Sequence, residues 1–527
     1  MLQPRSQPSH APAVPRQPAT PGSVRRKNAW LLDTVNLPSW VWVVLMVLVV
    51  WGATTANPLI TVCSLLLLPV IPWLLWRPGE PPVLMFAVTM QWLQACVGTF
   101  YHNSQGETLA GYFGGPELAR SSWLSLLGVL VLALGMKTAL AGVKQRNTSA
   151  FESEVQQFSF GRLAVAFGVL FLISVGIRTG AGIVPGLTQP LLAATSLHWI
   201  PVIFLAQAVL VQHRGYGWLA LVVAFEFAIG SIGFFSGFKE VFFLLAIVIL
   251  TTRAGLSRER WFAIGLVAFL ILGLNCLWTA IKVDYRFFLN QGTGEQVVNA
   301  PVPARIEKLG ELLGELDSER LQNGFEQSMQ RLSYVELFAH CIVTVPAELP
   351  YERGALWIGA VQQVFTPRLL FPDKAPIHDS YRAQKYTGLM LAGPEEGASI
   401  GIGYMAESYV DFGPVCMFAP IFLLGVFYGL IYRLFAYSKT GRLLGMALAI
   451  CILVFGACTI ETSNIKLIGG NTMAVLVMSL FQWQLGRPLM RFLRPAPAPT
   501  TVEERNRLRR KQSRQQSAHP RPPSAGL

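Results

Sequence analysis

Long apolar stretches alternate with short polar connections along most of the chain. About 20 mostly apolar residues cross the hydrocarbon layer of a membrane, and twelve stretches meet or approach that length. The predicted spans are 39–56, 58–76, 82–101, 121–143, 162–178, 198–212, 215–235, 238–253, 261–282, 413–434, 441–461 and 472–490. Because lipid offers an open backbone no hydrogen-bond partner, each span is predicted to be a helix. The pattern predicts an all-α polytopic membrane protein of about 12 transmembrane helices. The number is ten or eleven if one or both of the short stretches at 198–212 and 238–253 do not cross the membrane.

One connection is much longer than the others and carries more than half of the acidic side chains. It runs over 283–412, between the ninth and tenth predicted spans, and holds 10 Lys and Arg against 17 Asp and Glu. The pattern therefore divides the chain into a bundle at 29–282, a large loop at 283–412 and a second bundle segment at 413–494. The ends, 1–28 and 495–527, are rich in Pro, Ser, Gln and Arg, which predicts disordered tails.

Basic residues next to the predicted spans indicate which side of the membrane each connection occupies, because Lys and Arg gather in cytoplasmic connections. Alternate connections and both tails carry them. In the connections they are Arg77, Lys144, Arg146, Arg214, Arg253, Arg258, Arg260, Lys439 and Arg442. Most fall on one side, which predicts cytoplasmic termini and an extracytoplasmic loop at 283–412. The formal net charge of +13 is then mostly a topology signal and gives no reason to expect nucleic acid as a partner.

Composition agrees with a membrane protein and weakens several other classes. The chain has 527 residues, of which 52% are hydrophobic and 13% charged, whereas soluble proteins average roughly 25% charged residues. Its seven cysteines have no metal-ligand or redox spacing, so neither a metal site nor a disulfide framework is expected. The sequence has no P-loop, HExxH, GxSxG or kinase signature, and no cofactor is expected. The run from Gly401 to Ala406 resembles a dinucleotide fingerprint, but it follows no predicted strand.

The large loop contains helical patterns of its own. Apolar residues recur at three- and four-residue spacing within 303–333, which predicts an amphipathic helix. Tyr334–Val345 is apolar but too short to cross a membrane, so a helix buried against the bundle or a re-entrant segment is expected. A similar helix is expected at Ala355–Phe365.

The densest group of motif residues lies in Thr366–Pro376 (TPRLLFPDKAP). Three prolines restrict this backbone to extended or turning conformations. Arg368 and Lys374 flank the turn, and Asp373 directly precedes Lys374. By themselves these residues fit a rigid surface loop with a local ion pair as well as an anion-binding site.

This run resembles the motif of Wzy-type oligosaccharide repeat-unit polymerases, the O-antigen polymerase family of bacterial envelopes. The similarity covers roughly 230–435 and includes a short Gly-basic turn, a Tyr-Arg pair and a Phe-Gly entry into the next span. The segments concerned are Ser236–Lys239, Asp284–Arg286, Arg331–Ser333, Val345–Gly354 and Ser399–Gly413. One departure is Ala375, which separates Lys374 from Pro376 where family members often have Lys-Pro directly.

The resemblance implies a metal-independent glycosyltransferase of the bacterial inner membrane. Such enzymes join polyprenyl-diphosphate-linked repeat units on the outer face, and a chain-length regulator is a candidate partner. The leaving diphosphate gains negative charge, which Arg side chains can bind through paired hydrogen bonds. The candidates for this contact are Arg286, Arg331, Arg368, Lys374 and Lys239.

An acceptor hydroxyl is a weak nucleophile and benefits from a general base. The catalytic candidates in this chain are Glu407, Asp373 and His340, with His378 as a further one. Structural alternatives are a salt bridge to an arginine for Glu407 and a satisfied buried histidine for His340. Glu226 and Glu461 lie within predicted spans, where an unpaired carboxylate is unfavourable, so they are expected to pair with basic residues or to line a polar cavity.

Three other functions remain open from the sequence. A lipid-linked glycan flippase or transporter would place ionisable residues at mid-membrane and show two similar halves. An O-antigen ligase-like transferase would use similar chemistry on a different acceptor. A non-enzymatic scaffold is the third alternative, against which only the motif similarity speaks.

Overall fold

The computed structural model describes most of the chain between residues 39 and 494. The described ranges are 39–77, 79–113, 115–143, 149–181, 186–233, 237–251, 258–293, 298–366, 370–371, 374, 378–393, 399–438 and 441–494. Both predicted tails lie outside them.

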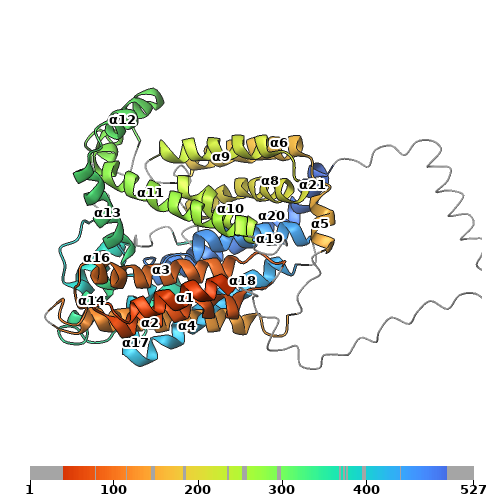
Figure 1. The fold of residues 1–527 in the computed structure, drawn as a ribbon. Helices are drawn as coiled ribbons and strands as arrows, with labels where there is room; N and C mark the ends of the chain where they lie inside the picture. Colours follow the sequence, from red (N-terminus) through yellow and green to blue (C-terminus); the bar gives the residue numbers. More distant parts are fainter. Residues whose placement is uncertain are drawn as a thin grey trace, which may run out of the picture.

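Every regular element in these ranges is a helix, so the all-α prediction is confirmed for them (Figure 1). In chain order the elements are α1 (Ser39–Gly52), α2 (Pro58–Leu75), α3 (Val83–Ser104), α4 (Glu117–Ala139), α5 (Ser149–Val155), α6 (Phe160–Gly180), α7 (Thr188–Thr195), η1 (Ser196–His198), α8 (Trp199–Gln212), α9 (Tyr216–Ser231), α10 (Phe238–Thr251), α11 (Arg258–Leu289), α12 (Val302–Gly314), α13 (Ser318–Leu332), α14 (Val335–Thr344), α15 (Ala355–Phe365), α16 (Asp379–Thr387), α17 (Gly403–Cys416), α18 (Phe418–Ala436), α19 (Arg442–Gly456), α20 (Asn464–Gln484) and α21 (Gly486–Leu493).

Each predicted span overlaps a helix, because a long apolar run is itself the signal for a membrane helix. Within the described ranges, eight helical segments are long and apolar enough to cross a membrane. They are Pro58–Leu75, Val83–Ser104, Glu117–Ala139, Phe160–Gly180, Thr188–Gln212, Gly265–Leu289, Phe418–Ala436 and Asn464–Gln484. The other four predicted spans correspond to α1, α9, α10 and α19, which have 14 to 16 residues.

The span expected to be short at 198–212 belongs to a longer helical segment. α7, η1 and α8 follow one another from Thr188 to Gln212, which gives 25 residues. Polar residues in α7, such as Thr188 and Gln189, hide this extension from a search for apolar runs.

Hydrogen bonds between connections show that the helices share two ends. At the first, Asn57 before α2 donates from Nδ2 to Asn103 Oδ1 near the end of α3 (2.8 Å). At the second, Arg77 after α2 donates from Nη2 to the carbonyl of Val143 after α4 (2.8 Å). Figure 1 shows α14 and α16 at the first end and α5 and α21 at the second. The first end is called the loop end here and the second the basic end.

The basic end gathers arginines from connections far apart in the sequence. The guanidinium of Arg214 lies 5.7 Å from the ring centre of Phe160, and that of Arg442 lies 5.9 Å from the ring centre of Phe151. With Arg77, they place three of the predicted basic connections at one end. This common side agrees with the charge pattern, and the assignment of that side to the cytoplasm stays a prediction.

Two apolar clusters hold the described helices together. The larger joins buried side chains of α2–α4, α8, α10 and α14–α20 into one core. The smaller surrounds Trp278 and Tyr285 of α11 and includes Phe238 of α10 and Leu312 of α12. α11 is thus anchored to the loop helices by its own cluster, and it continues to Leu289, beyond the predicted boundary at 282.

The large loop folds into short helices over the loop end. The amphipathic stretch 303–333 forms two helices, α12 and α13, where the pattern predicted one. The break follows Gly314, and Asp317 caps α13 by accepting from the backbone N–H of Arg320 at Oδ1 (2.7 Å). α14 and α15 occupy the two short stretches predicted to be helical.

The connection between α19 and α20 is not helical, and side chains of α3 hold its backbone. Gln91 donates from Nε2 to the carbonyl of Ala457 (2.8 Å), and Gln94 donates likewise to Cys458 (3.0 Å). Gln94 Oε1 also accepts from the backbone N–H of Ile460 (2.8 Å). These bonds satisfy polar backbone groups that would otherwise be buried unpaired.

Candidate functional site

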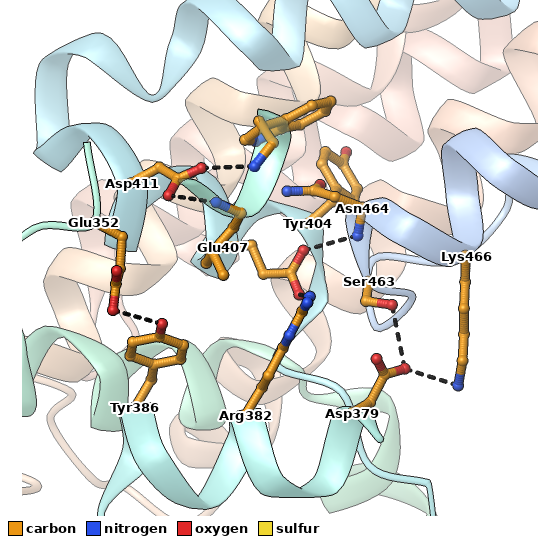
Figure 2. A network of polar contacts seen from close by, with 12 residues as sticks. Glu352, Asp379, Arg382, Tyr386, Tyr404, Glu407, Asp411, Ser463, Asn464 and Lys466 are labelled. Atoms are coloured by element: carbon orange, nitrogen blue, oxygen red, sulfur yellow. Dashed lines mark hydrogen bonds and ion pairs between the residues drawn. The ribbon is translucent and has the colours of Figure 1, made fainter. Parts of the chain in front are cut away.

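Glu407 of α17 is the centre of a polar network at the loop end (Figure 2). Its side chain is only 1% exposed. Oε2 accepts from the backbone N–H of Asn464 in the first turn of α20 (2.8 Å), and Oε1 lies 3.7 Å from Nη1 of Arg382 in α16. Burial raises the pKa of Glu407 to about 7, against the opposing effects of the Asn464 N–H and Arg382. The predicted salt bridge of Glu407 to an arginine is therefore present, with Arg382 as the partner.

A second buried carboxylate, Asp379, lies at the start of α16. Its Oδ2 is 2.7 Å from Nζ of Lys466 in α20 and accepts from Ser463 Oγ (3.2 Å). Lys466 is largely exposed, and Arg382 is partly exposed. The network is therefore buried at its carboxylates and reaches the surface through its two cations. Figure 2 shows Arg382 and Lys466 extending toward Glu407 and Asp379.

Asp411, one turn after Glu407, has a structural role. Its two oxygens accept from the backbone N–H groups of Leu356 (3.1 Å) and Trp357 (2.9 Å) at the start of α15 (Figure 2). Charge at this position compensates the unpaired N–H groups of a helix N-terminus. Asp411 thus fixes α15 against α17.

Several polar atoms of the network have no hydrogen-bond partner among the described residues. They include both side-chain polar atoms of the fully buried Asn464, Oδ1 of Asp379 and Nη1 of Arg382. An unsatisfied buried polar group costs about 1–3 kcal/mol, so native proteins rarely keep several together. These atoms have hydrogen-bonding capacity to offer to hydroxyl groups.

Four basic side chains from three helices gather at the same end and are called the basic cluster. They are Lys239 of α10, Lys282 and Arg286 of α11, and Arg331 of α13. Lys239, Arg286 and Arg331 all lie close enough to Lys282 to repel its charge. Lys239 donates from Nζ to Asn275 Oδ1 (2.7 Å).

Lys282 and Arg331 differ in exposure, but the side chains of both lack a partner in the described chain. Lys282 is 8% exposed, whereas Arg331 lies on the surface. Neither forms a hydrogen bond or an ion pair through its side chain with a residue of the described ranges. Two cations without a protein carboxylate partner indicate a place where an anion can bind.

The predicted diphosphate-binding residues do not all lie in one place. Lys239, Arg286 and Arg331 come together in the basic cluster. Lys374 donates from Nζ to the carbonyls of Gln363 (2.9 Å) and Thr366 (2.5 Å), at the C-terminus of α15. Arg368 lies outside the described residues, so its role stays a prediction.

The predicted catalytic residues are also separated. Glu407 lies in the polar network, and Asp373 lies outside the described residues. The ring of His340 in α14 packs 4.6 Å from that of Phe113 and makes no hydrogen bond or ion pair with the described part of the chain. The structure therefore does not place His340 in the Glu407 network.

Sequence reasoning missed several members of both groups. Lys282 stands four positions before Arg286 on α11, a spacing that places both on one helix face and could have been noticed. Arg382, Asp379 and Lys466 had no comparable signal, because their contacts join α16 to α17 and α20.

Glu461 and Glu226, both predicted to lie in spans, have opposite surroundings. Glu461 is exposed on the connection between α19 and α20, within electrostatic reach of Lys239 and Tyr334. Glu226 of α9 is buried, with Oε1 3.6 Å from Nε2 of His198. Nδ1 of His198 donates to the carbonyl of Thr195 (2.5 Å), so Nε2 is the nitrogen that faces the carboxylate.

Comparison with known proteins places the chain in a family. A family described as a domain of unknown function, DUF8712, matches residues 101–483. The chain belongs to this family. The part shared with DUF8712 contains the basic cluster and Glu407 with Arg382, Asp379 and Lys466. No curated protein and no solved structure matches the chain.

Proposed function

We propose that this protein is a glycosyltransferase of the bacterial inner membrane that polymerises polyprenyl-diphosphate-linked oligosaccharide repeat units. The growing lipid-linked chain is the donor, and the next repeat unit supplies the acceptor hydroxyl. Both meet at the loop end, on the outer face of a bundle of about twelve spans with cytoplasmic termini. The proposal rests on the motif similarity and on the geometry of the loop end.

The basic cluster is the observation that carries the proposal. Four cations in one place repel one another, and a buried lysine without a carboxylate partner is unfavourable unless an anion is bound. A diphosphate is a compact anion with several oxygens for such donors. Arg331, exposed and without an ion pair in the described chain, can offer its planar fork to these oxygens.

The surface of α11 suits the lipid part of such a substrate. This helix carries Lys282 and Arg286, and it also exposes a series of large apolar side chains. They are Phe262, Leu266, Phe269, Leu270, Leu272, Val283 and Phe287. A polyprenyl chain can therefore lie along α11 while its diphosphate contacts the cations near the end of the same helix.

Purified full-length protein with a lipid-linked repeat unit, in the presence of a chelator, tests the proposal. We expect products of increasing length, and we expect Arg331→Ala to lower the rate about 10²–10³-fold, the effect of removing one donor to a developing negative charge. The matched control is Arg320→Ala on the same helix, since Arg320 is exposed and pairs with Glu315 (3.4 Å). A strict requirement for Mg²⁺ or Mn²⁺, or equal rates in the two variants, would contradict the arginine-based mechanism.

One observation favours a second candidate, a transporter of lipid-linked glycans. The buried pair of His198 and Glu226 is the kind of ionisable site that transporters place within the membrane. A deletion strain separates the two functions. A polymerase deletion still delivers single repeat units to the outer face and lacks long chains, whereas loss of a transporter leaves the units on the cytoplasmic leaflet.

A further inference from the structure

Glu461 is accessible to solvent, unlike the three buried carboxylates of the polar network and of α17. It is exposed, whereas Glu407, Asp379 and Asp411 are at most 2% exposed. Its carboxylate forms no hydrogen bond or ion pair with any residue in the described part of the chain. A hydroxyl group from outside the protein can therefore approach Glu461 without breaking an existing contact.

The backbone that carries Glu461 is held in place on both sides. Gln91 and Gln94 bind the preceding residues of the connection. The start of α17 packs directly against it, since a Cβ at Gly403, which has φ +83°, would collide with the carbonyl of Ile460. After Glu461, the first turn of α20 is fixed by the bond from Asn464 N–H to Glu407. A carboxylate on such a connection is positioned before substrate binds.

Glu461 is also within electrostatic reach of the basic cluster. Its charge acts on Lys239, which Arg331 also influences, and on Tyr334. Tyr334 in turn lies within electrostatic reach of Asp379 and Glu407. Ser463 and Asn464, which follow Glu461 closely, bond to Asp379 and Glu407. Glu461 is therefore near both the cations and the buried polar network, where a sugar attached to a bound diphosphate would be located.

We infer, on the basis of the proposed function, that Glu461 is the catalytic carboxylate that removes the proton from the acceptor hydroxyl. The hydroxyl oxygen forms a bond to the anomeric carbon of the donor, and its proton passes to Glu461. The bond between that carbon and the diphosphate oxygen breaks, and its electron pair leaves with the polyprenyl diphosphate. The basic cluster neutralises the charge of this leaving group.

Glu407 is then a positioning residue and not the base. A general base must come within about 2.6–3.2 Å of the hydroxyl it deprotonates, directly or through one water. Glu407 is shielded by Arg382 and by the first turn of α20, and its Oε2 is already occupied by the Asn464 N–H. Its effect on the reaction is to hold Arg382 and the start of α20, next to Glu461.

Glu461→Gln tests the assignment, with Glu315→Gln as the control because Glu315 is an exposed carboxylate between α12 and α13. Chain extension by the full-length protein is measured as kcat over a range of pH, together with binding of polyprenyl diphosphate. We expect Glu461→Gln to lower kcat about 10²–10⁴-fold, the usual contribution of a general base, and to abolish the acidic limb of the kcat profile. Binding of polyprenyl diphosphate and the thermal unfolding temperature should stay as in the wild type, because the side chain is exposed and unpaired.

The possible failures are distinguishable. If the wild type extends chains and Glu461→Gln does so at the same rate with the same pH profile, Glu461 is not the base and the proposed function stands. Equal losses of polyprenyl diphosphate binding and kcat would also overturn the assignment, since they would make Glu461 a binding residue. If the wild type does not extend lipid-linked repeat units at all, the proposed function and the inference both fail.

Discussion

Each end of the bundle contains a network around a buried carboxylate, and the two networks differ in how many of their polar atoms are hydrogen-bonded. At the basic end, Glu80 is 2% exposed, and both of its carboxylate oxygens are bound. Oε2 accepts from Arg77 Nε (3.0 Å) and Tyr432 Oη (3.3 Å), and Oε1 accepts from Tyr437 Oη (2.5 Å). Arg77 additionally donates to the carbonyl of Val143. This network joins the connections after α2, α4 and α18.

At the loop end, by contrast, buried polar groups are left unsatisfied within the described chain. Lys282 has no ion pair there, and both polar side-chain atoms of Asn464 lack a hydrogen bond. Unsatisfied buried groups reduce stability, and native proteins keep them mainly at sites that serve a function. A network whose polar atoms are all bound holds connections together, whereas a network with unbound polar atoms keeps hydrogen-bonding capacity for a ligand.

The largest effect expected from this comparison comes from Lys282→Met. Loss of the buried cation should lower the rate of chain extension about 10²–10³-fold, because a donor to the developing diphosphate charge is removed. The free energy of unfolding should not fall, since Met fills a similar space without an unpaired charge.

Chain-extension rates and thermal unfolding in detergent check both halves of this prediction. Lys308→Met is the control, because Lys308 pairs with Glu311 of α12 (2.6 Å) at some distance along the loop. A Lys282→Met protein that unfolds at a lower temperature but extends chains normally would show that the lysine is structural.

Glu407→Gln tests whether burial of this carboxyl makes the stability of the protein depend on pH. The folded pKa of about 7 lies above the ordinary value of 4.5, so the stability that this group contributes is fully present below pH 4.5 and is lost as pH rises through 7. The loss amounts to about 3 kcal/mol, taking 1.36 kcal/mol for each pKa unit. Glu407→Gln removes this dependence, and its amide oxygen can still accept from the Asn464 N–H.

Thermal unfolding at pH 5 and pH 8 measures this effect as the difference between wild type and variant. We expect the wild type to lose stability between pH 5 and pH 8, and the variant to lose less over the same range. An identical pH dependence in both proteins would mean that Glu407 is already ionised at pH 5.

The smallest effect concerns the basic end. Tyr437→Phe removes one hydrogen bond from Glu80 and leaves the other two, which should lower the free energy of unfolding by about 1 kcal/mol. Chain extension should be unaffected, and measuring both quantities provides the check. A variant of normal stability that extends chains poorly would break the distinction between the two ends.

The helices could be predicted largely from the sequence, because apolar runs and amphipathic spacing are local properties. α14 and α15 occupy the stretches predicted for them, and each predicted span overlaps a helix. The division of 303–333 was missed although Asp317, an N-cap residue, was visible. The length of the segment from Thr188 to Gln212 was missed because its first turns are polar.

The candidate site was predictable only in part. Motif similarity selected Lys239, Arg286 and Arg331, and the structure brings these three together. The motif similarity offered no reason to choose Arg382 or Lys466, because a residue on α16 or α20 acquires its partner only when these helices pack against α17.

Sequence patterns were sufficient to predict that the described ranges are all-helical, that apolar segments long enough to cross a membrane recur along the chain, and that acidic residues concentrate in one long connection. These features depend on hydrophobicity and charge read over short windows. Only the tertiary structure decided which charges are satisfied. Both carboxylate oxygens of Glu80 are bound through contacts between connections distant in the sequence, whereas Lys282 meets no carboxylate partner in the described chain. Exposure also depends on packing, since α16 and α20 pack around Glu407 of α17 and bury it, whereas Glu461 on the connection before α20 stays exposed.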